Sequence, residues 1–131
     1  MFGVTREQLG QTGPLADLDP ETVDAVMEQS LFVWVPRDQT IVHQGDAGHE
    51  FYIILTGHAE VRRDGSTVAE LGPGDVFGEM AASGATRSAD VVATEPLTLM
   101  TMSYWNYRHL ERERPDLANR LSDLAASRRP D

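Results

Sequence analysis

The stretch FYIILTGHAEVRRDGSTVAEL, residues 51–71, decides the fold class. It holds three short strand-like runs, near residues 51–55, 58–63 and 68–71, separated by Thr56-Gly57 and Asp64-Gly65. Glycine accepts the backbone conformations that tight turns require, and Asp-Gly between two such runs is a strong hairpin signal. The stretch therefore predicts consecutive antiparallel strands joined by short turns.

The same pattern of short strands and turns continues on both sides of this stretch. Turn residues recur at Gly45-Asp46, at 72–75 (GPGD) and at Glu95-Pro96. The strands expected between these turns lie near residues 32–35, 40–43, 76–77, 89–93 and 97–102. Eight short strands at regular spacing predict an eight-stranded antiparallel jelly roll, also called a double-stranded β-helix.

Helical signals flank the β region. Asp19-Pro20-Glu21 supplies an N-cap, a first-position proline and an acidic first turn. Ser103 can cap a helix carrying Trp105 and Tyr107, which we expect in the core rather than stacking on a base, and Pro115 starts a second helix. We predict one mainly β domain over residues 1–131: N-terminal helices within 5–30, a β-roll over 31–102 and two C-terminal helices within 103–129.

Composition excludes several classes of protein. The 131 residues are 40% hydrophobic, which suits one domain with a modest core, and contain no cysteine for disulfides or thiolate metal sites. No apolar run approaches the length of a membrane span, and no secretory signal is visible. The net charge of −10 argues against nucleic acid as a partner. We expect a soluble, cytoplasmic protein that binds neither membrane nor nucleic acid.

The stretch FGEMAASGATRSADVVA, residues 77–93, carries the candidate site. Glu79 can accept hydrogen bonds from a sugar hydroxyl, and Arg87 can fork onto two oxygens of a phosphate. Small residues between them would let backbone N–H groups approach that phosphate. Arg87 is the lone arginine between Asp64 and Tyr107, in an acidic part of the chain. Together these groups favour a nucleotide-sized ligand.

Two motifs in order resemble the cyclic-nucleotide-binding domains, such as those of the cyclic AMP receptor and of protein kinase regulatory subunits. IVHQGDAGHEFYIILTG, residues 41–57, is similar to the family's early strand–turn–strand signature, with Gly45, Gly48 and Gly57 at the turns. The 77–93 stretch resembles its phosphate-binding cassette. The resemblance covers roughly residues 15–128 and implies a binding domain with no cofactor beyond its nucleotide ligand.

The resemblance assigns a role to each cassette residue. It implies that Glu79 accepts a bond from the ribose 2′-hydroxyl, that Arg87 pairs with the exocyclic phosphate oxygens, and that Ser88 adds a hydroxyl donor. Backbone N–H groups would complete the cradle. A threonine after the arginine is associated with cyclic GMP in this family, so Ser88 favours cyclic AMP, with cyclic GMP as the alternative. The ligand-binding set implied is Gly78, Glu79, Met80, Ala81, Ala82, Arg87, Ser88 and Ala89.

The cassette also departs from the family pattern. A large aliphatic residue usually stands where Ala82 is, and at least one more residue usually precedes the arginine. A shorter loop with more alanine and glycine is less firmly packed. Two alternatives to the ligand site therefore stay open: a degenerate fold serving as a ligand-free protein-interaction module, and a structural ion pair between Glu79 and Arg87.

As a sensor, the domain would act on an unidentified effector protein. Ligand would shift the C-terminal helices through Met80 and the aromatic residues after Ser103. Residues 103–131 are too few for the output modules of the family, so we expect the output in a partner, unless the chain is an excised domain. Leu121 and Leu124 could cover the base, pack internally or form a homodimer seam.

An enzyme or a metal site is not expected from these residues. Ser83 and Ser88 lack an evident histidine partner, and Asp75 and Asp90 fit turn and strand-face positions. The four histidines invite comparison with metal-binding cupins, which are also jelly rolls, but that pattern needs two histidines one residue apart and a later glutamate. The histidines here stand at positions 43, 49, 58 and 109.

Overall fold

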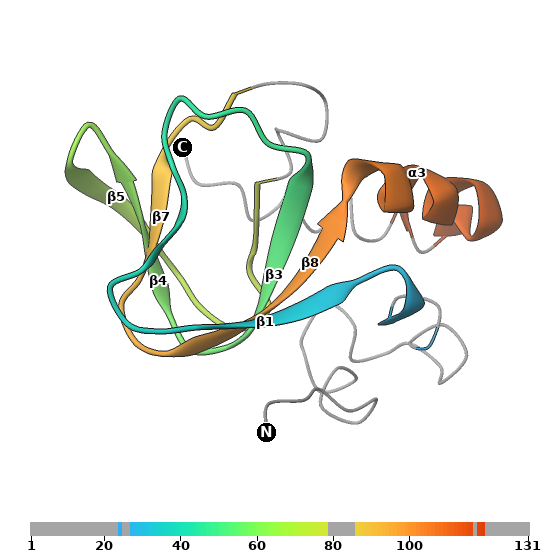
Figure 1. Cartoon of the computed structure of the whole chain (residues 1–131), viewed down its shortest axis with the longest axis horizontal. Helices are drawn as coiled ribbons and strands as arrows, with labels where there is room; N and C mark the ends of the chain where they lie inside the picture. The colour runs from blue at the N-terminus through green and yellow to red at the C-terminus, as the bar shows by residue number, and fades with distance from the viewer. Residues whose placement is uncertain (1–23, 25–26, 79–85, 117, 120–131) are drawn as a thin grey trace.

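The computed structural model describes residues 24, 27–78, 86–116 and 118–119 (Figure 1). Every strand expected from the sequence is present in this part of the chain. The elements are β1 (Leu31–Val35), β2 (Thr40–Val42), β3 (Glu50–Thr56), β4 (Ala59–Arg63), β5 (Ser66–Leu71), β6 (Val76–Phe77), β7 (Asp90–Ala93), β8 (Leu97–Ser103) and the helix α3 (Tyr104–Glu113).

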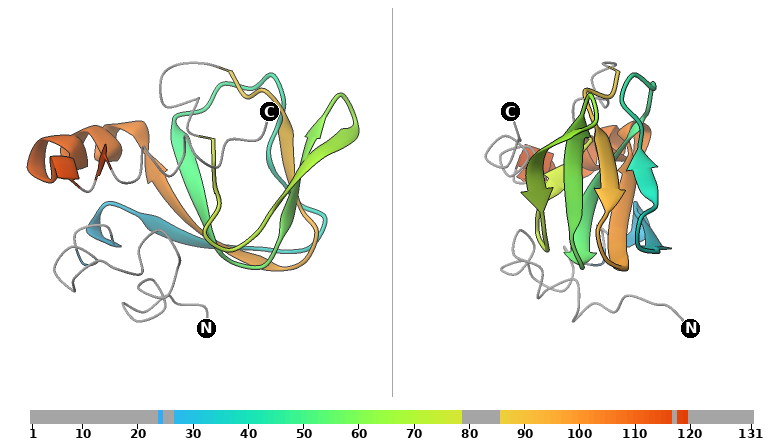
Figure 2. Two further views of the ribbon diagram at one scale, coloured as in Figure 1. Left: turned by 180° about the vertical axis from the view of Figure 1, so that it is seen from behind. Right: turned by 90° about the vertical axis from the view of Figure 1, so that its left-hand side faces the viewer.

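The strands form two four-stranded sheets in which each pairing is antiparallel. Their orders are β1-β8-β3-β6 and β2-β7-β4-β5. Successive strands pass from one sheet to the other except at the β4–β5 hairpin, which gives the roll seen in Figure 2. The predicted jelly roll is confirmed. The helix α3 follows β8 directly and lies on the opposite side of the roll from the β4–β5 hairpin (Figure 1).

The β4–β5 hairpin follows from its two turn residues. Asp64 and Gly65 both have positive φ, 53° and 84°, and the flanking Arg63 and Ser66 are paired. A two-residue turn with both residues in this region matches the right-handed twist of the strands it joins. The dipeptide identified in the sequence therefore fixes the pairing next to the turn, and the register shifts further along, between Val61 and Arg62.

Two apolar clusters make up the core, one on each side of the first sheet. Along β3 the side chains alternate: Tyr52 and Ile54 join the cluster between the sheets, whereas Phe51 and Ile53 face α3. Full burial of each large apolar side chain stabilises the fold by roughly 1.5–3 kcal/mol. Because both faces of β3 are covered, its sequence is an uninterrupted apolar run instead of an alternating one.

The helix α3 is capped as predicted by Ser103, whose Oγ accepts a hydrogen bond from the backbone N–H of Asn106 at 3.1 Å. Tyr107 packs edge-on against Phe51, with ring centroids 5.7 Å apart. The expectation that Trp105 is also in the core is wrong, since it is 63% exposed. Two residues along a helix are about 200° apart around its axis, so Trp105 and Tyr107 cannot share one buried face.

The expected boundaries differ from the observed ones by one or two residues. His43 and His58 lie just outside β2 and β4 because each already belongs to the adjoining turn, and Ala89 precedes β7. The helix expected from Pro115 is present at 115–116 and 118–119, and helical conformation occurs at Asp24 and 27–28. The remainder of the predicted terminal helices lies outside the described residues. None of the described helices could span a membrane.

Candidate functional site

The backbone of Arg87 is fixed against the 43–49 loop, which connects β2 to β3. The N–H of Arg87 donates to the carbonyl of Asp46 at 2.8 Å, and the N–H of Gly45 donates to the carbonyl of Arg87 at 2.8 Å. The next contact along the loop is the N–H of Gln44, which donates to Asp90 Oδ1 at 2.6 Å. These reciprocal bonds continue the β2–β7 pairing and hold the arginine at the end of the roll.

The side chain of Arg87 is buried, with 8% of the residue exposed. Its Nη1 donates to the carbonyl of Gly78 at 3.1 Å. Among the described residues, no carboxylate lies within ion-pair distance of the guanidinium. Burying a cation is costly unless an anion compensates it, and the planar fork of a guanidinium suits bidentate pairing with phosphate or carboxylate. The arginine is therefore suited to an anionic ligand.

Two glycines make room for the guanidinium. A Cβ atom on Gly48 would lie 2.6 Å from both Cζ and Nε of Arg87, closer than real Cβ contacts allow. A Cβ on Gly78 would lie 2.6 Å from Nη1, and Gly78 also has a φ of +84°. The sequence indicated Gly48 only as a turn residue. The structure adds that it must lack a side chain for Arg87 to occupy this position.

Tyr52 lies beside the same guanidinium, with its ring centroid 5.8 Å from Arg87 Cζ. The ring also stacks on Phe77, with centroids 4.9 Å apart and planes 15° from parallel. Burial raises the pKa of Tyr52 above its ordinary 10.0, the nearby Glu50 carboxylate raises it further, and Arg87 opposes the shift. Sequence reasoning missed Tyr52. The available signal was its alternation with Ile54, which puts both side chains inside the roll.

The structure places half of the predicted ligand-binding set. Gly78 and Arg87 are in contact, as described above. Ser88 has an exposed side chain, and its carbonyl accepts a hydrogen bond from Arg63 Nε at 3.2 Å. Ala89 is buried in the cluster between the sheets. The other predicted residues, and with them the alternative ion pair to Arg87, lie outside the described residues: Glu79, Met80, Ala81 and Ala82.

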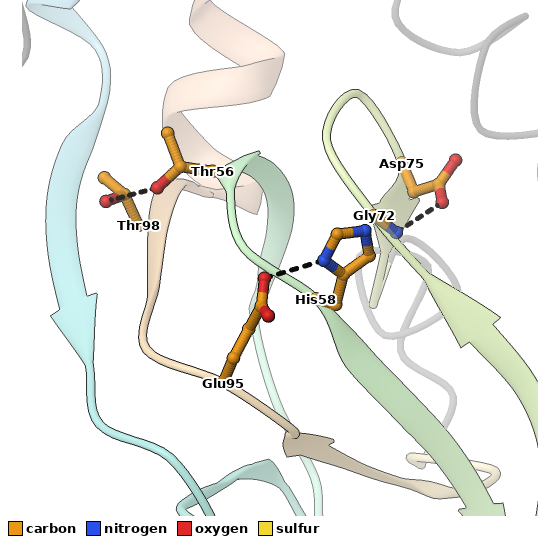
Figure 3. Close-up of polar contacts among 6 residues, drawn as sticks. All are labelled: Thr56, His58, Gly72, Asp75, Glu95 and Thr98. Atoms are coloured by element: carbon orange, nitrogen blue, oxygen red, sulfur yellow. Dashed lines mark hydrogen bonds and ion pairs between the residues drawn. The ribbon is translucent and has the colours of Figure 1, made fainter.

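A polar cluster at the other end of β3 accounts for one of the histidines (Figure 3). His58 Nδ1 lies 2.7 Å from Glu95 Oε1, joining the turn before β4 to the turn before β8. Beside it the N–H of Gly72 donates to Asp75 Oδ2 at 2.8 Å. The described residues contain no group of three acidic, histidine or cysteine side chains suited to a metal ion. The His58–Glu95 contact joins two turns, the Gly72–Asp75 bond closes the turn before β6, and Thr56 bonds Thr98 across β3 and β8, which gives this cluster a structural explanation.

The sequence is similar to one known family and to several characterised proteins. The family model described as the cyclic nucleotide-binding domain matches residues 32–112. The cyclic AMP receptor protein of Thermus thermophilus is 34% identical over 117 residues, which cover 85% of this chain and 54% of the relative. Glutaminase 2 of Bradyrhizobium diazoefficiens is 34% identical over 109 residues, 80% of this chain and 18% of that protein. The chain thus spans only part of the length of these relatives.

Solved structures agree with the sequence match. The crystal structure of a cyclic nucleotide-binding domain from Methylobacillus flagellatus superposes with a TM-score of 0.78 at 30% identity. The match covers 93% of this chain and 74% of that one. The similarity therefore extends over nearly the whole length of this chain.

Proposed function

The chain belongs to the cyclic nucleotide-binding domain family, and from this we propose that it is a sensor that binds cyclic AMP in preference to cyclic GMP. The observation that carries the proposal is the buried Arg87 guanidinium, which has no carboxylate partner among the described residues. A cyclic phosphodiester is a compact monoanion with two exocyclic oxygens, which matches the two-pronged donor face of one arginine.

The rest of the proposed site follows the predicted set. Glu79 would accept a hydrogen bond from the ribose 2′-hydroxyl, and the Ser88 hydroxyl would join Arg87 at the phosphate. The N–H groups of Gly78, Ala81 and Ala82 would complete the cradle, with Met80 and Ala89 as its further members. Serine at position 88 is the basis for preferring cyclic AMP to cyclic GMP.

We propose that the ligand signal leaves the domain through its C-terminal helices. The first turn of α3 touches the same 43–49 loop that holds Arg87: the N–H of Tyr104 donates to the carbonyl of His49 at 2.6 Å. The His49 and Trp105 rings also meet, with centroids 5.1 Å apart. A change at the arginine thus has a short physical path to α3. The output would lie in a partner protein, or elsewhere in a longer protein of which this domain forms part.

Calorimetric titration with cyclic AMP, cyclic GMP and linear 5′-AMP tests the binding proposal. We expect cyclic AMP to bind most tightly and Arg87→Ala to abolish binding at ligand concentrations that saturate the unsubstituted protein. Arg62→Ala is a matched control, because Arg62 is a partly exposed strand residue paired with Glu60 at 3.6 Å. Absence of binding at millimolar cyclic nucleotide would refute the proposal and favour the ligand-free interaction module.

A further inference from the structure

Three planar groups meet beside the candidate site. The Phe77 ring stacks on the Tyr52 ring, and the Arg87 guanidinium lies over the Tyr52 ring, with Cζ 5.8 Å from the ring centroid. Phe77 is buried and Tyr52 half-buried. Both aromatic residues come from the paired strands β3 and β6, where Tyr52 and Phe77 are register partners. The ring next to the guanidinium is thus held in place by strand pairing and by its stacking on Phe77.

The other contacts of Arg87 hold its guanidinium in place but do not set its orientation. The carbonyl of Gly78 holds Nη1, and the backbone of Gly48 limits movement on another side. Among the described residues, this is the one hydrogen bond that the guanidinium donates, and one bond fixes a single nitrogen without setting the tilt of the guanidinium plane. An aromatic face within about 6 Å attracts a cation. It therefore restricts the direction in which the remaining N–H donors point.

We propose that Tyr52 is a positioning residue, whose ring face orients the Arg87 guanidinium for a bound phosphate. The inference rests on the proposed function, since it names how the phosphate donor of that site is aligned. The ring, rather than the hydroxyl, performs this role: among the described residues, none forms a hydrogen bond with the Tyr52 hydroxyl. We therefore expect phenylalanine to replace Tyr52, and leucine, which is apolar but smaller and has no aromatic face, to fail.

The binding test compares Tyr52→Phe and Tyr52→Leu by calorimetry with cyclic AMP. We expect Tyr52→Phe to bind within about twofold of the unsubstituted protein and Tyr52→Leu to lose about tenfold, the size expected for a buried cation–π contact. Val61→Ala controls for loosening of the core, because Val61 is buried in the same cluster between the sheets. A loss in Tyr52→Leu no larger than that in Val61→Ala would overturn the inference.

A second readout needs no ligand. Atoms above an aromatic face are shifted upfield, so the Arg87 Nε–Hε and δ-methylene NMR signals should be displaced in the free protein. Arg87→Lys identifies these signals by their disappearance. The displacement should persist in Tyr52→Phe and be lost in Tyr52→Leu, and an unchanged signal in Tyr52→Leu would overturn the inference.

The two readouts also separate the inference from the proposed function. If the unsubstituted protein binds no cyclic nucleotide, the proposed function fails, and the role of Tyr52 in aligning a phosphate donor fails with it, even if the NMR displacement is present. If the protein binds but Tyr52→Leu binds equally well, only the inference fails. Binding together with both Tyr52→Leu losses supports both.

Discussion

Gly48→Ala should damage ligand binding while leaving the fold intact. The added Cβ would lie 2.6 Å from Cζ and Nε of Arg87. Comfortable separations are about 3.5 Å, so the guanidinium must withdraw by about 1 Å. The side chain can do this, because the atoms met belong to the far end of a flexible arginine and not to backbone. The substitution therefore moves the proposed phosphate donor and little else.

The magnitude follows from the hydrogen bonds that this withdrawal would break. A hydrogen bond to a charged group contributes about 1.5–3 kcal/mol, so loss of one Arg87–phosphate bond corresponds to roughly 10- to 100-fold in affinity. Gly48 is not among the glycines with positive φ, so alanine introduces no backbone strain there. The free energy of unfolding should change by less than about 1 kcal/mol, since alanine also reduces the entropy of the unfolded chain.

Calorimetric titration with cyclic AMP and urea denaturation measure the two quantities separately. Gly65→Ala is the matched control in the β4–β5 turn: it has a φ of +84° and nothing within 4 Å of an added Cβ. It should cost about 1–2 kcal/mol of stability through backbone strain and leave affinity within about twofold. The reasoning is refuted if Gly48→Ala binds as tightly as the unsubstituted protein, or if it loses stability as Gly65→Ala does.

Three further substitutions test other contacts. Arg87→Lys retains the charge but not the fork, so calorimetry should show a loss of about 10- to 100-fold in cyclic AMP affinity, whereas Arg62→Lys should change it less than twofold. Relative to Tyr52→Phe, the unsubstituted protein should lose stability in urea unfolding as the pH rises above 10. The pKa of Tyr52 is raised in the folded state, so its hydroxyl deprotonates first in the unfolded chain. A stability difference that stays constant between pH 9 and 11 would contradict that assignment. Ser103→Ala removes the acceptor for the Asn106 N–H and should lower the free energy of unfolding in urea by about 1 kcal/mol. An unchanged urea midpoint would show that the cap does not stabilise the fold.

The sequence predicted the strands well because their signals are local. Asp64-Gly65 specifies its own turn, and Ser103 specifies where a helix can begin, independently of the rest of the chain. Trp105 was misplaced because helical periodicity was not applied to two aromatic residues only two positions apart. The sequence also singled out Arg87, by its isolation in an acidic section and by the family motif around it.

The surroundings of Arg87 could not be predicted in the same way. Gly48 lies beside Arg87 because the 43–49 loop pairs with the backbone of Arg87, and Tyr52 lies there because of its position in β3. The register between segments far apart in the chain cannot be predicted from either segment alone. Glycine signals in a sequence do not distinguish a turn from a close approach. Gly45 has positive φ and open space around it, whereas Gly48 has neither, so they are glycines for different physical reasons.

The 43–49 loop offers a physical path for the coupling proposed above. Its middle exchanges two backbone hydrogen bonds with Arg87, and its last residue, His49, accepts a hydrogen bond from the first residue of α3. Backbone bonds on both sides leave the loop little freedom to absorb a displacement, since yielding on either side would leave backbone groups unpaired. Trp105, exposed yet in contact with His49, lies at the end of this path. Trp105 lies outside the core and in contact with the loop, so a movement of the loop would reach α3 through it. The loop is therefore a specific physical route for the proposed signal.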